Sequence, residues 1–179
     1  LQVTASAKTY LLENGYDEDA FTLAAARKSQ PGRDGRIVLL HSGIVYSSER
    51  DPTQLFAALR QLKQSAHPLA RRLLLRLRAT GNDASMREMI AAADIADLVE
   101  LAPAIPYADA LAEMLSVDGL LVLQAANCND QIPAKAYEYL RAQRPLLALT
   151  DPAGDTADVI RRAGIDTIAP LDDSDAIFA

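Results

Sequence analysis

The sequence predicts a doubly wound α/β domain, in which a parallel sheet of about six strands carries helices on both faces. Three observations predict this fold class. The strand-like segments are short apolar runs without alternation, each run precedes a segment with helical spacing of its apolar residues, and turn residues separate the two. Strands that are apolar on both sides are typical of parallel sheets, because helices cover both faces of such a sheet.

The predicted strands are runs of Leu, Ile and Val that end at a turn residue or a charge. The first run, RIVLLHSG, ends at Gly43, and the second, RRLLLRLRATG, ends at Gly81. In chain order the strands are expected at or within 36–43, 71–81, 96–105, 118–125, 145–151 and 166–172.

The predicted helices have apolar residues three and four positions apart. In 51–64, Leu55 and Leu59 share one face, and we expect Asp51 as the N-cap with Pro52 at the first helical position. The other helices are expected at 84–95, 107–117, within 131–144 and at 155–164.

Residues 1–35 differ from the rest of the chain. They mix apolar and small polar residues, contain the turn signal Asn14-Gly15, and include one short helical pattern before a loop rich in Gly, Pro and charge. We interpret 1–35 as a linker or extended approach segment and 36–179 as the domain. The chain begins at Leu1 rather than at a methionine, which favours an excised piece of a longer protein.

The composition excludes several classes of protein. A net charge of −6 argues against nucleic-acid binding as the main role, since such proteins usually carry a basic excess. The single cysteine, Cys128, favours a reducing compartment and hence the cytoplasm. With two histidines far from it, a structural zinc site is not expected, and no run approaches the ~20 apolar residues of a transmembrane helix.

The loops that follow the strands are the places to search for a ligand, because doubly wound sheets bind ligands beyond the carboxyl ends of their strands. In the loop after 36–43, Gly43 permits a close approach of a ligand to the backbone, and Ser47, Ser48 and Arg50 can donate hydrogen bonds to phosphate. The alternative is a solvated loop in which Glu49 balances Arg50. The phosphate-binding patterns GxxxxGK[ST] and GxGxxG are absent.

The helix within 131–144 follows the fourth strand, so its N-terminus should lie at this same edge. Asn129 or Asp130 is expected to cap it, and Pro133 suits its first turn. The free N–H groups and positive dipole end of such a helix favour a phosphate, to which Lys135 would add a formal charge.

Glu138 lies three residues after Lys135, so the two share a helix face. A carboxylate there suits the two hydroxyls of a ribose. Tyr137 and Tyr139 flank Glu138 and are expected to pack on either side of it. The alternative is an exposed Lys–Glu pair worth only ~0.3–0.5 kcal/mol.

The chain resembles the C-terminal, donor-binding domain of GT-B glycosyltransferases of the retaining, nucleotide-sugar-using kind. Four phrases carry the resemblance in the family's order over nearly the whole chain. They are Asn14-Gly15-Tyr16-Asp17 through Phe21, HSGIVYSSERDPTQLFAAL at 41–59, ELAPAIPYADALAEMLSVDGLLVL at 100–123, and IPAKAYEYLRAQRPLLAL at 132–149. The last, which is similar to the family phrase PxKxxEYLAxxRPxLAL, is the most specific.

The resemblance implies a Rossmann-like fold and a binding site for a nucleoside-diphosphate sugar, with no cofactor and no metal. The implied diphosphate-binding residues are Gly43, Arg50 and Lys135, and the implied ribose-binding residue is Glu138. Ala104, Ile105 and Tyr107 would flank the base, and Asn129, Asp130 and Gln131 would lie on the donor-sugar side. Asp130 stands where many relatives carry a glutamate eight positions before the second acidic residue. No general base is assigned, and His41, a lone histidine at a strand end, is expected to be structural.

The resemblance also implies a partner domain. In the family an N-terminal domain holds most of the acceptor site, so this chain alone is expected to bind donor weakly and not to catalyse transfer. Any peripheral association with a membrane is expected to occur through that N-terminal domain. Two alternatives stay open. One is another enzyme of the same fold, such as a sugar-nucleotide epimerase or a phosphorylase, and the other is a non-catalytic interaction module.

Overall fold

The chain forms a six-stranded sheet in which every strand is parallel to its neighbours. The computed structural model describes residues 10, 12–27, 35–65 and 67–179. The strands, in the spatial order β3-β2-β1-β4-β5-β6, are β1 (Ile37–Ser42), β2 (Leu73–Arg78), β3 (Val99–Ala102), β4 (Gly119–Leu123), β5 (Leu146–Leu149) and β6 (Ile168–Ala169). The predicted fold class is therefore confirmed, although each strand is shorter than its apolar run.

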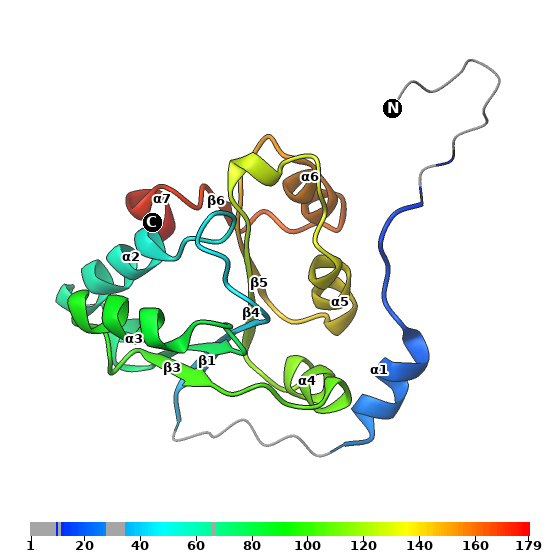
Figure 1. Cartoon of the computed structure of the whole chain (residues 1–179), viewed down its shortest axis with the longest axis horizontal. Coiled ribbons are helices and arrows are strands. Elements are labelled where there is room, and N and C mark those ends of the chain that lie inside the picture. Colours follow the sequence, from blue (N-terminus) through cyan, green and yellow to red (C-terminus); the bar gives the residue numbers. More distant parts are fainter. Residues whose placement is uncertain (1–9, 11, 28–34, 66) are drawn as a thin grey trace.

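Helices cover both faces of this sheet (Figure 1). One face carries α2 (Thr53–Gln64), α3 (Asp83–Ala92) and α7 (Ser174–Phe178). The other carries α1 (Glu18–Ala25), α4 (Tyr107–Met114), α5 (Ala134–Ala142) and α6 (Asp155–Arg162). Two short 3₁₀ turns, Pro68–Arg71 and Ala126–Cys128, complete the described elements.

Each face has its own apolar core. Leu75 and Leu77 of β2 pack toward α2 and α3, whereas Leu74, next to them in sequence, packs toward α4. All six residues of β2 are buried, as expected for a strand covered on both sides. The alternation of neighbours from face to face explains why the sequence shows a continuous apolar run.

The helix α1 lies within the segment that the sequence assigns to the linker. Its Phe21 and Ala24 are buried in the same core as α4 and α5, and α1 packs against α4. Arg141 of α5 forms an ion pair with Glu18 at 2.5 Å and lies over the Phe21 ring. The face of the sheet that carries α4, α5 and α6 is thus completed by residues that precede 36.

Two details of the predicted helices are wrong. Pro52, rather than Asp51, is the N-cap of α2, and the Asp51 carboxylate instead accepts a hydrogen bond from the N–H of Thr53 at 2.9 Å. The sequence also missed α7, a five-residue helix capped by Asp173, which packs against α2. Helices this short have little periodicity, so tertiary contacts determine them.

A charged cluster is buried between β2 and α4. Glu113 of α4 accepts hydrogen bonds from Arg76 at 2.9 Å and from Arg78 at 2.7 Å. Arg76 also donates to Glu100 of β3 at 2.9 Å, and Arg78 donates to the Pro103 carbonyl at 2.6 Å. The cluster fixes α4, together with the loop that precedes it, against the edge of the sheet. None of the helices in the described part of the chain is long and apolar enough to span a membrane.

Candidate functional site

The sheet has its switch point between β1 and β4, which are neighbours at its centre. From β1 the chain passes to α2 on one face, and from β4 it passes to α5 on the other. Connections that diverge in this way leave a crevice beyond the carboxyl ends of the two strands. The loop after Ser42 and the start of α5 border this crevice, and they carry the residues predicted to bind diphosphate.

Gly43 ends β1 in a backbone conformation that requires glycine. Its φ is +120°, and its N–H donates to the Arg78 carbonyl at 2.9 Å. A Cβ built on Gly43 would lie 3.0 Å from Nζ of Lys135. The lysine ammonium group therefore lies directly against the Gly43 backbone, in space that any other residue would occupy.

Lys135 reaches the crevice from the first turn of α5. Its Nζ lies 3.2 Å from Nε2 of His41. Burial, followed by the positive charge of Arg50, lowers the pKa of Lys135 to about 7, while Glu138 acts in the opposite direction. Within the described ranges no carboxylate forms an ion pair with Lys135 or with Arg50. Two cations near one another without carboxylate partners are suited to an anion.

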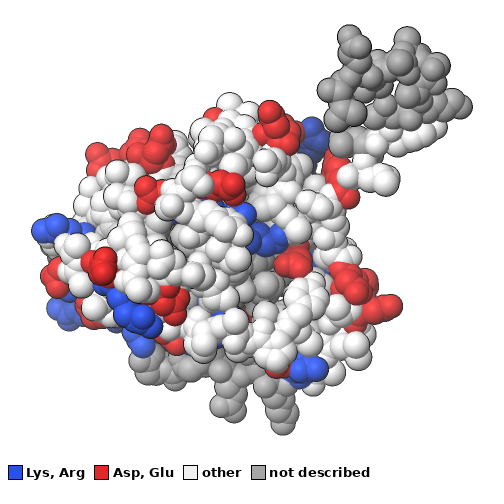
Figure 2. Space-filling model, in the orientation of Figure 1, with Lys and Arg blue, Asp and Glu red and all other residues white. Residues whose placement is uncertain are grey.

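Arg50 is the second cation at this edge. Its guanidinium donates to the Ile44 carbonyl at 2.9 Å and lies over the Tyr46 ring, 5.3 Å from the ring centroid. These contacts hold the side chain beside the loop that begins at Gly43. Figure 2 shows Lys or Arg atoms in a hollow near the middle of this face, bordered by Asp or Glu atoms.

The N-terminus of α5 lacks a side-chain cap. Pro133 is the N-cap residue, and neither Asn129 nor Asp130 bonds to the first turn, so the predicted cap is wrong. The Asn129 amide instead donates to Asp151 at 2.6 Å, because the loop bends toward the β5–α6 connection. An uncapped helix start with Lys135 in its first turn retains the features that favour anion binding.

A residue of α4 orients the Glu138 side chain, a contact that the sequence did not indicate. The Tyr107 hydroxyl donates to Oε1 of Glu138 at 2.7 Å. Burial and this bond raise the pKa of Tyr107 to about 12. The exposed Lys135–Glu138 pair considered as an alternative is not formed.

The two tyrosines expected to pack on either side of Glu138 have other roles. Tyr139 is buried, and its hydroxyl accepts a hydrogen bond from the N–H of Ser42 at 2.9 Å, which joins α5 to the end of β1. Tyr137 donates to Glu13 at 3.1 Å on the outer side of the helix. The hydrogen bond that orients the Glu138 carboxylate comes from Tyr107 instead.

Of the residues predicted to flank the base, Ala104 and Ile105 lie in the loop before α4 and Tyr107 is the first residue of α4. Ala104 and Tyr107 are exposed and Ile105 is half-buried. The Arg78 bond to the Pro103 carbonyl fixes the start of this loop, and the Tyr107–Glu138 bond fixes its end. The structure thus brings this loop next to the predicted ribose-binding carboxylate.

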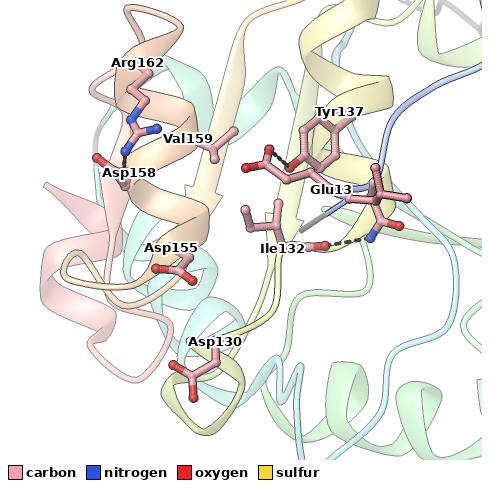
Figure 3. Close-up of a pocket in the computed structure, with 10 residues that line it drawn as sticks. Glu13, Asp130, Ile132, Tyr137, Asp155, Asp158, Val159 and Arg162 are labelled. Atoms are coloured by element: carbon pink, nitrogen blue, oxygen red, sulfur yellow. Dashed lines mark hydrogen bonds and ion pairs between the residues drawn. The ribbon is translucent and has the colours of Figure 1, made fainter. Parts of the chain in front are cut away.

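The three consecutive residues predicted for the donor-sugar side have side chains in different surroundings. Gln131 lines a small cavity of about 170 Å³ that also contains Arg50. Asp130 lines a different cavity of about 360 Å³ between residues 12–14 and α6, at whose end it lies near Asp155 (Figure 3). The side-chain oxygen of Asn129 is buried without a hydrogen-bond partner, close to Gly154.

Two buried polar residues of the site were missed or dismissed by the sequence reasoning. Gln124, just after β4, donates to the carbonyls of Cys128 at 2.8 Å and Gln131 at 2.6 Å, and so shapes the loop that leads to α5. His41 was expected to be structural, but it contacts Lys135. A polar residue at the end of an apolar strand was the available signal for both. In the part of the chain that the structure describes, no group of three His, Cys, Asp or Glu residues could hold a metal ion.

Comparisons with known proteins identify the fold. No protein-family model and no curated protein sequence matches the chain. Among solved structures, the trehalose-6-phosphate synthase of Burkholderia xenovorans in complex with glucose-6-phosphate matches with a TM-score of 0.69 and 14% identity over 93% of this chain and 41% of its own. The enzyme of Burkholderia multivorans has a TM-score of 0.67 and 17% identity over 92% and 41%. That of E. coli, bound with UDP-2-fluoro glucose, has a TM-score of 0.67 and 14% identity over 92% and 41%.

The chain thus spans about two fifths of the length of these enzymes. One of these neighbours is described as a synthase that forms UDP. Another trehalose-6-phosphate synthase structure that matches is described in terms of glycosyl transfer with retention. The predicted fold is confirmed by these matches: the chain folds like about two fifths of these synthases.

Proposed function

We propose that this chain is the donor-binding domain of a glycosyltransferase, which moves a sugar from a nucleoside-diphosphate donor to an acceptor held mainly by a second domain. The observation that carries the proposal is the position of the Lys135 ammonium, which lies against Gly43 at the switch point of the sheet without a carboxylate partner among the described residues. The fold shared with UDP-forming synthases supports it.

Lys135, Arg50, the Gly43 backbone and the start of α5 bind the donor diphosphate. In the transfer reaction the bond from the anomeric carbon to the diphosphate breaks, and negative charge develops on the leaving oxygen. Cations and helix N–H groups that are already oriented stabilise this charge without reorganising. The residues of the site therefore supply electrostatic stabilisation in addition to binding.

Glu138 accepts hydrogen bonds from the ribose hydroxyls, while Ala104, Ile105 and Tyr107 flank the base. Tyr107 holds one carboxylate oxygen of Glu138 and leaves the other free to face the ligand. Gln131 lies next to the diphosphate residues, whereas Asn129 and Asp130 are on the side of α6. The donor sugar would extend from the start of α5 toward this side.

The proposal is tested by isothermal titration with UDP-, GDP- and ADP-sugars. The first to try is UDP-glucose, because a UDP-sugar analogue is bound in one structural neighbour. Binding of at least one donor is expected. If none binds, even after the second domain is restored, the chain is a non-catalytic module; if the chain alone transfers sugar, the assignment of the acceptor site to a second domain is wrong.

Replacing Glu138 by Ala is expected to weaken binding of the donor about tenfold or more, the range for a hydrogen bond to a charged group. The loss should vanish when the titrated nucleotide is 2′,3′-dideoxy-UDP, which lacks both hydroxyls. Glu88→Ala, which removes an exposed carboxylate from α3 on the opposite face, is the matched control and should change nothing. An equal loss with the dideoxy nucleotide would exclude the ribose contact.

The pKa of Lys135, about 7, makes donor binding pH-dependent near neutrality. A bound diphosphate favours the charged lysine and raises its pKa, so the protein takes up about half a proton on binding at pH 7. Affinity is then fully present below pH 7 and falls as pH rises, by at most about tenfold per unit. UDP-glucose titrated calorimetrically in buffers of different ionisation enthalpy measures this uptake, which should be absent in Lys135→Met. Proton release on binding would contradict the assignment.

A further inference from the structure

His41 is a buried polar residue that the proposed binding contacts do not use. It lies in β1, two residues before Gly43, and its side chain is inaccessible to solvent. Both ring nitrogens have a neighbour: Nδ1 is 2.9 Å from the Leu121 carbonyl oxygen of β4, and Nε2 is 3.2 Å from Nζ of Lys135. The ring therefore connects β1, β4 and α5, the three elements that meet at the switch point.

These two contacts determine the tautomer of the imidazole. A carbonyl oxygen can only accept a hydrogen bond, so Nδ1 of His41 must carry the proton and donate it to Leu121. In a neutral ring Nε2 then has a free lone pair, and it can accept a hydrogen bond from the Lys135 ammonium group, which can only donate. One tautomer satisfies both contacts.

The surroundings keep this ring neutral. Burial lowers the pKa of His41 well below its usual range, and the charges of Lys135 from α5 and Arg50 from the β1–α2 loop lower it further, against the opposing effect of the Leu121 bond. Glu138, one turn along α5, acts on Lys135 by favouring its charged form. His41 is therefore a hydrogen-bond acceptor for Lys135 throughout the neutral pH range.

We propose that His41 is a positioning residue for Lys135, in that its unprotonated Nε2 holds the ammonium group against the Gly43 backbone where the donor diphosphate binds. The proposal rests on the proposed function, because it assigns a purpose to the direction of Lys135. A lysine side chain has four rotatable bonds, and an anchor on Nζ orders it before the ligand arrives. A carboxylate anchor would neutralise the charge, whereas a neutral imidazole leaves it available to the diphosphate.

Two substitutions test whether the hydrogen-bond acceptor at Nε2, rather than the rest of the His41 side chain, positions Lys135. His41→Gln retains an oxygen acceptor near the position of Nε2, and His41→Asn retains a donor toward Leu121 but is too short to reach Lys135. We expect His41→Asn to weaken UDP-glucose binding about tenfold and to reduce its proton uptake, and His41→Gln to stay within about threefold of the wild type. Uridine, which has no phosphate, should bind equally to all three. Thermal denaturation confirms that each variant is folded.

The wild-type protein provides a readout that needs no stable variant at position 41. Nitrogen-15 NMR of the imidazole should show a protonated Nδ1 and an unprotonated Nε2 for His41; the chain has two histidines, so His67→Gln assigns the signals. A protonated Nε2, or equal donor affinities for the Gln and Asn variants and the wild type, overturns the positioning role. If the wild type binds no UDP-, GDP- or ADP-sugar, the proposed function itself fails. Failure of the positioning role alone differs, because the wild type then still binds a donor.

Discussion

Replacing Lys135 by Met is expected to weaken UDP-glucose binding about 10- to 100-fold, the range for losing a hydrogen bond between charged groups. The methionine side chain retains most of the stem of the lysine and removes its charge. Among the residues that the structure describes, no carboxylate forms an ion pair with Lys135. The substitution therefore leaves no buried acid without its partner. The loss should therefore report on the ligand rather than on a disrupted ion pair.

The comparison of two ligands and two variants makes this test specific. Uridine lacks the diphosphate, so its affinity should be the same for the wild type and Lys135→Met. Arg60→Met removes a positive charge from an exposed position on α2 and controls for net charge. Equal losses for uridine and UDP-glucose, or an equal loss in the Arg60 variant, would mean that Lys135 does not contact the diphosphate.

Replacing Glu113 by Ala is expected to destabilise the fold by about 3–5 kcal/mol, because it leaves the buried Arg78 without a carboxylate and Arg76 with only the more exposed Glu100. The side chain of Glu113 is 6% exposed, and those of Arg76 and Arg78 are 8% and 11% exposed. For a chain of this size the loss corresponds to a fall in melting temperature of roughly 6–20 °C. Chemical denaturation at neutral pH measures the unfolding free energy.

The matched control is Glu100→Ala on β3, whose side chain is 42% exposed and pairs with Arg76. A pair that accessible contributes at most about 1 kcal/mol. Replacing Arg76, Arg78 and Glu113 together with apolar residues should recover most of the stability, since burial of unpaired charge is the cause of the loss. A Glu113 variant as stable as the Glu100 variant would contradict this explanation.

Much of the fold could be predicted from the sequence because the sheet is buried on both sides. The six apolar runs and the helical periods between them locate every strand and each longer helix. The pattern alone does not specify α7, whose five residues depend on packing against α2. Nor does it specify the partners of Arg76 and Arg78, which look like exposed charges in the sequence but pair with Glu113, more than 30 positions away.

The candidate site was predictable in its elements but not in its contacts. Strand-end position and helix geometry made Gly43, Arg50, Lys135 and Glu138 candidates, and the family resemblance implied their roles. The contacts that orient them come from distant residues: His41 lies 94 positions before Lys135, and Tyr107 lies 31 before Glu138. Local spacing carries no information on such pairs.

The position of Asp130 in the sequence did not indicate which cavity its side chain would line. Its place eight residues before Glu138 matches an acidic residue of the resembled family. In the structure the loop 125–133 forms a 3₁₀ turn and is held by Gln124 and by the Asn129–Asp151 bond. As a result Asp130 lines the cavity beside α6 rather than the one that contains Arg50.

An amide NMR titration of the chain with UDP tests most directly whether the crevice between β1 and β4 binds a nucleoside diphosphate. We expect the largest shifts at Gly43 and Ile44 and at Ala134–Ala136 in the first turn of α5, and we expect Lys135→Met to reduce them greatly. Shifts confined to the cavity beside α6, at Asp155 and Asp158, or the absence of any shift near Gly43, would contradict this expectation.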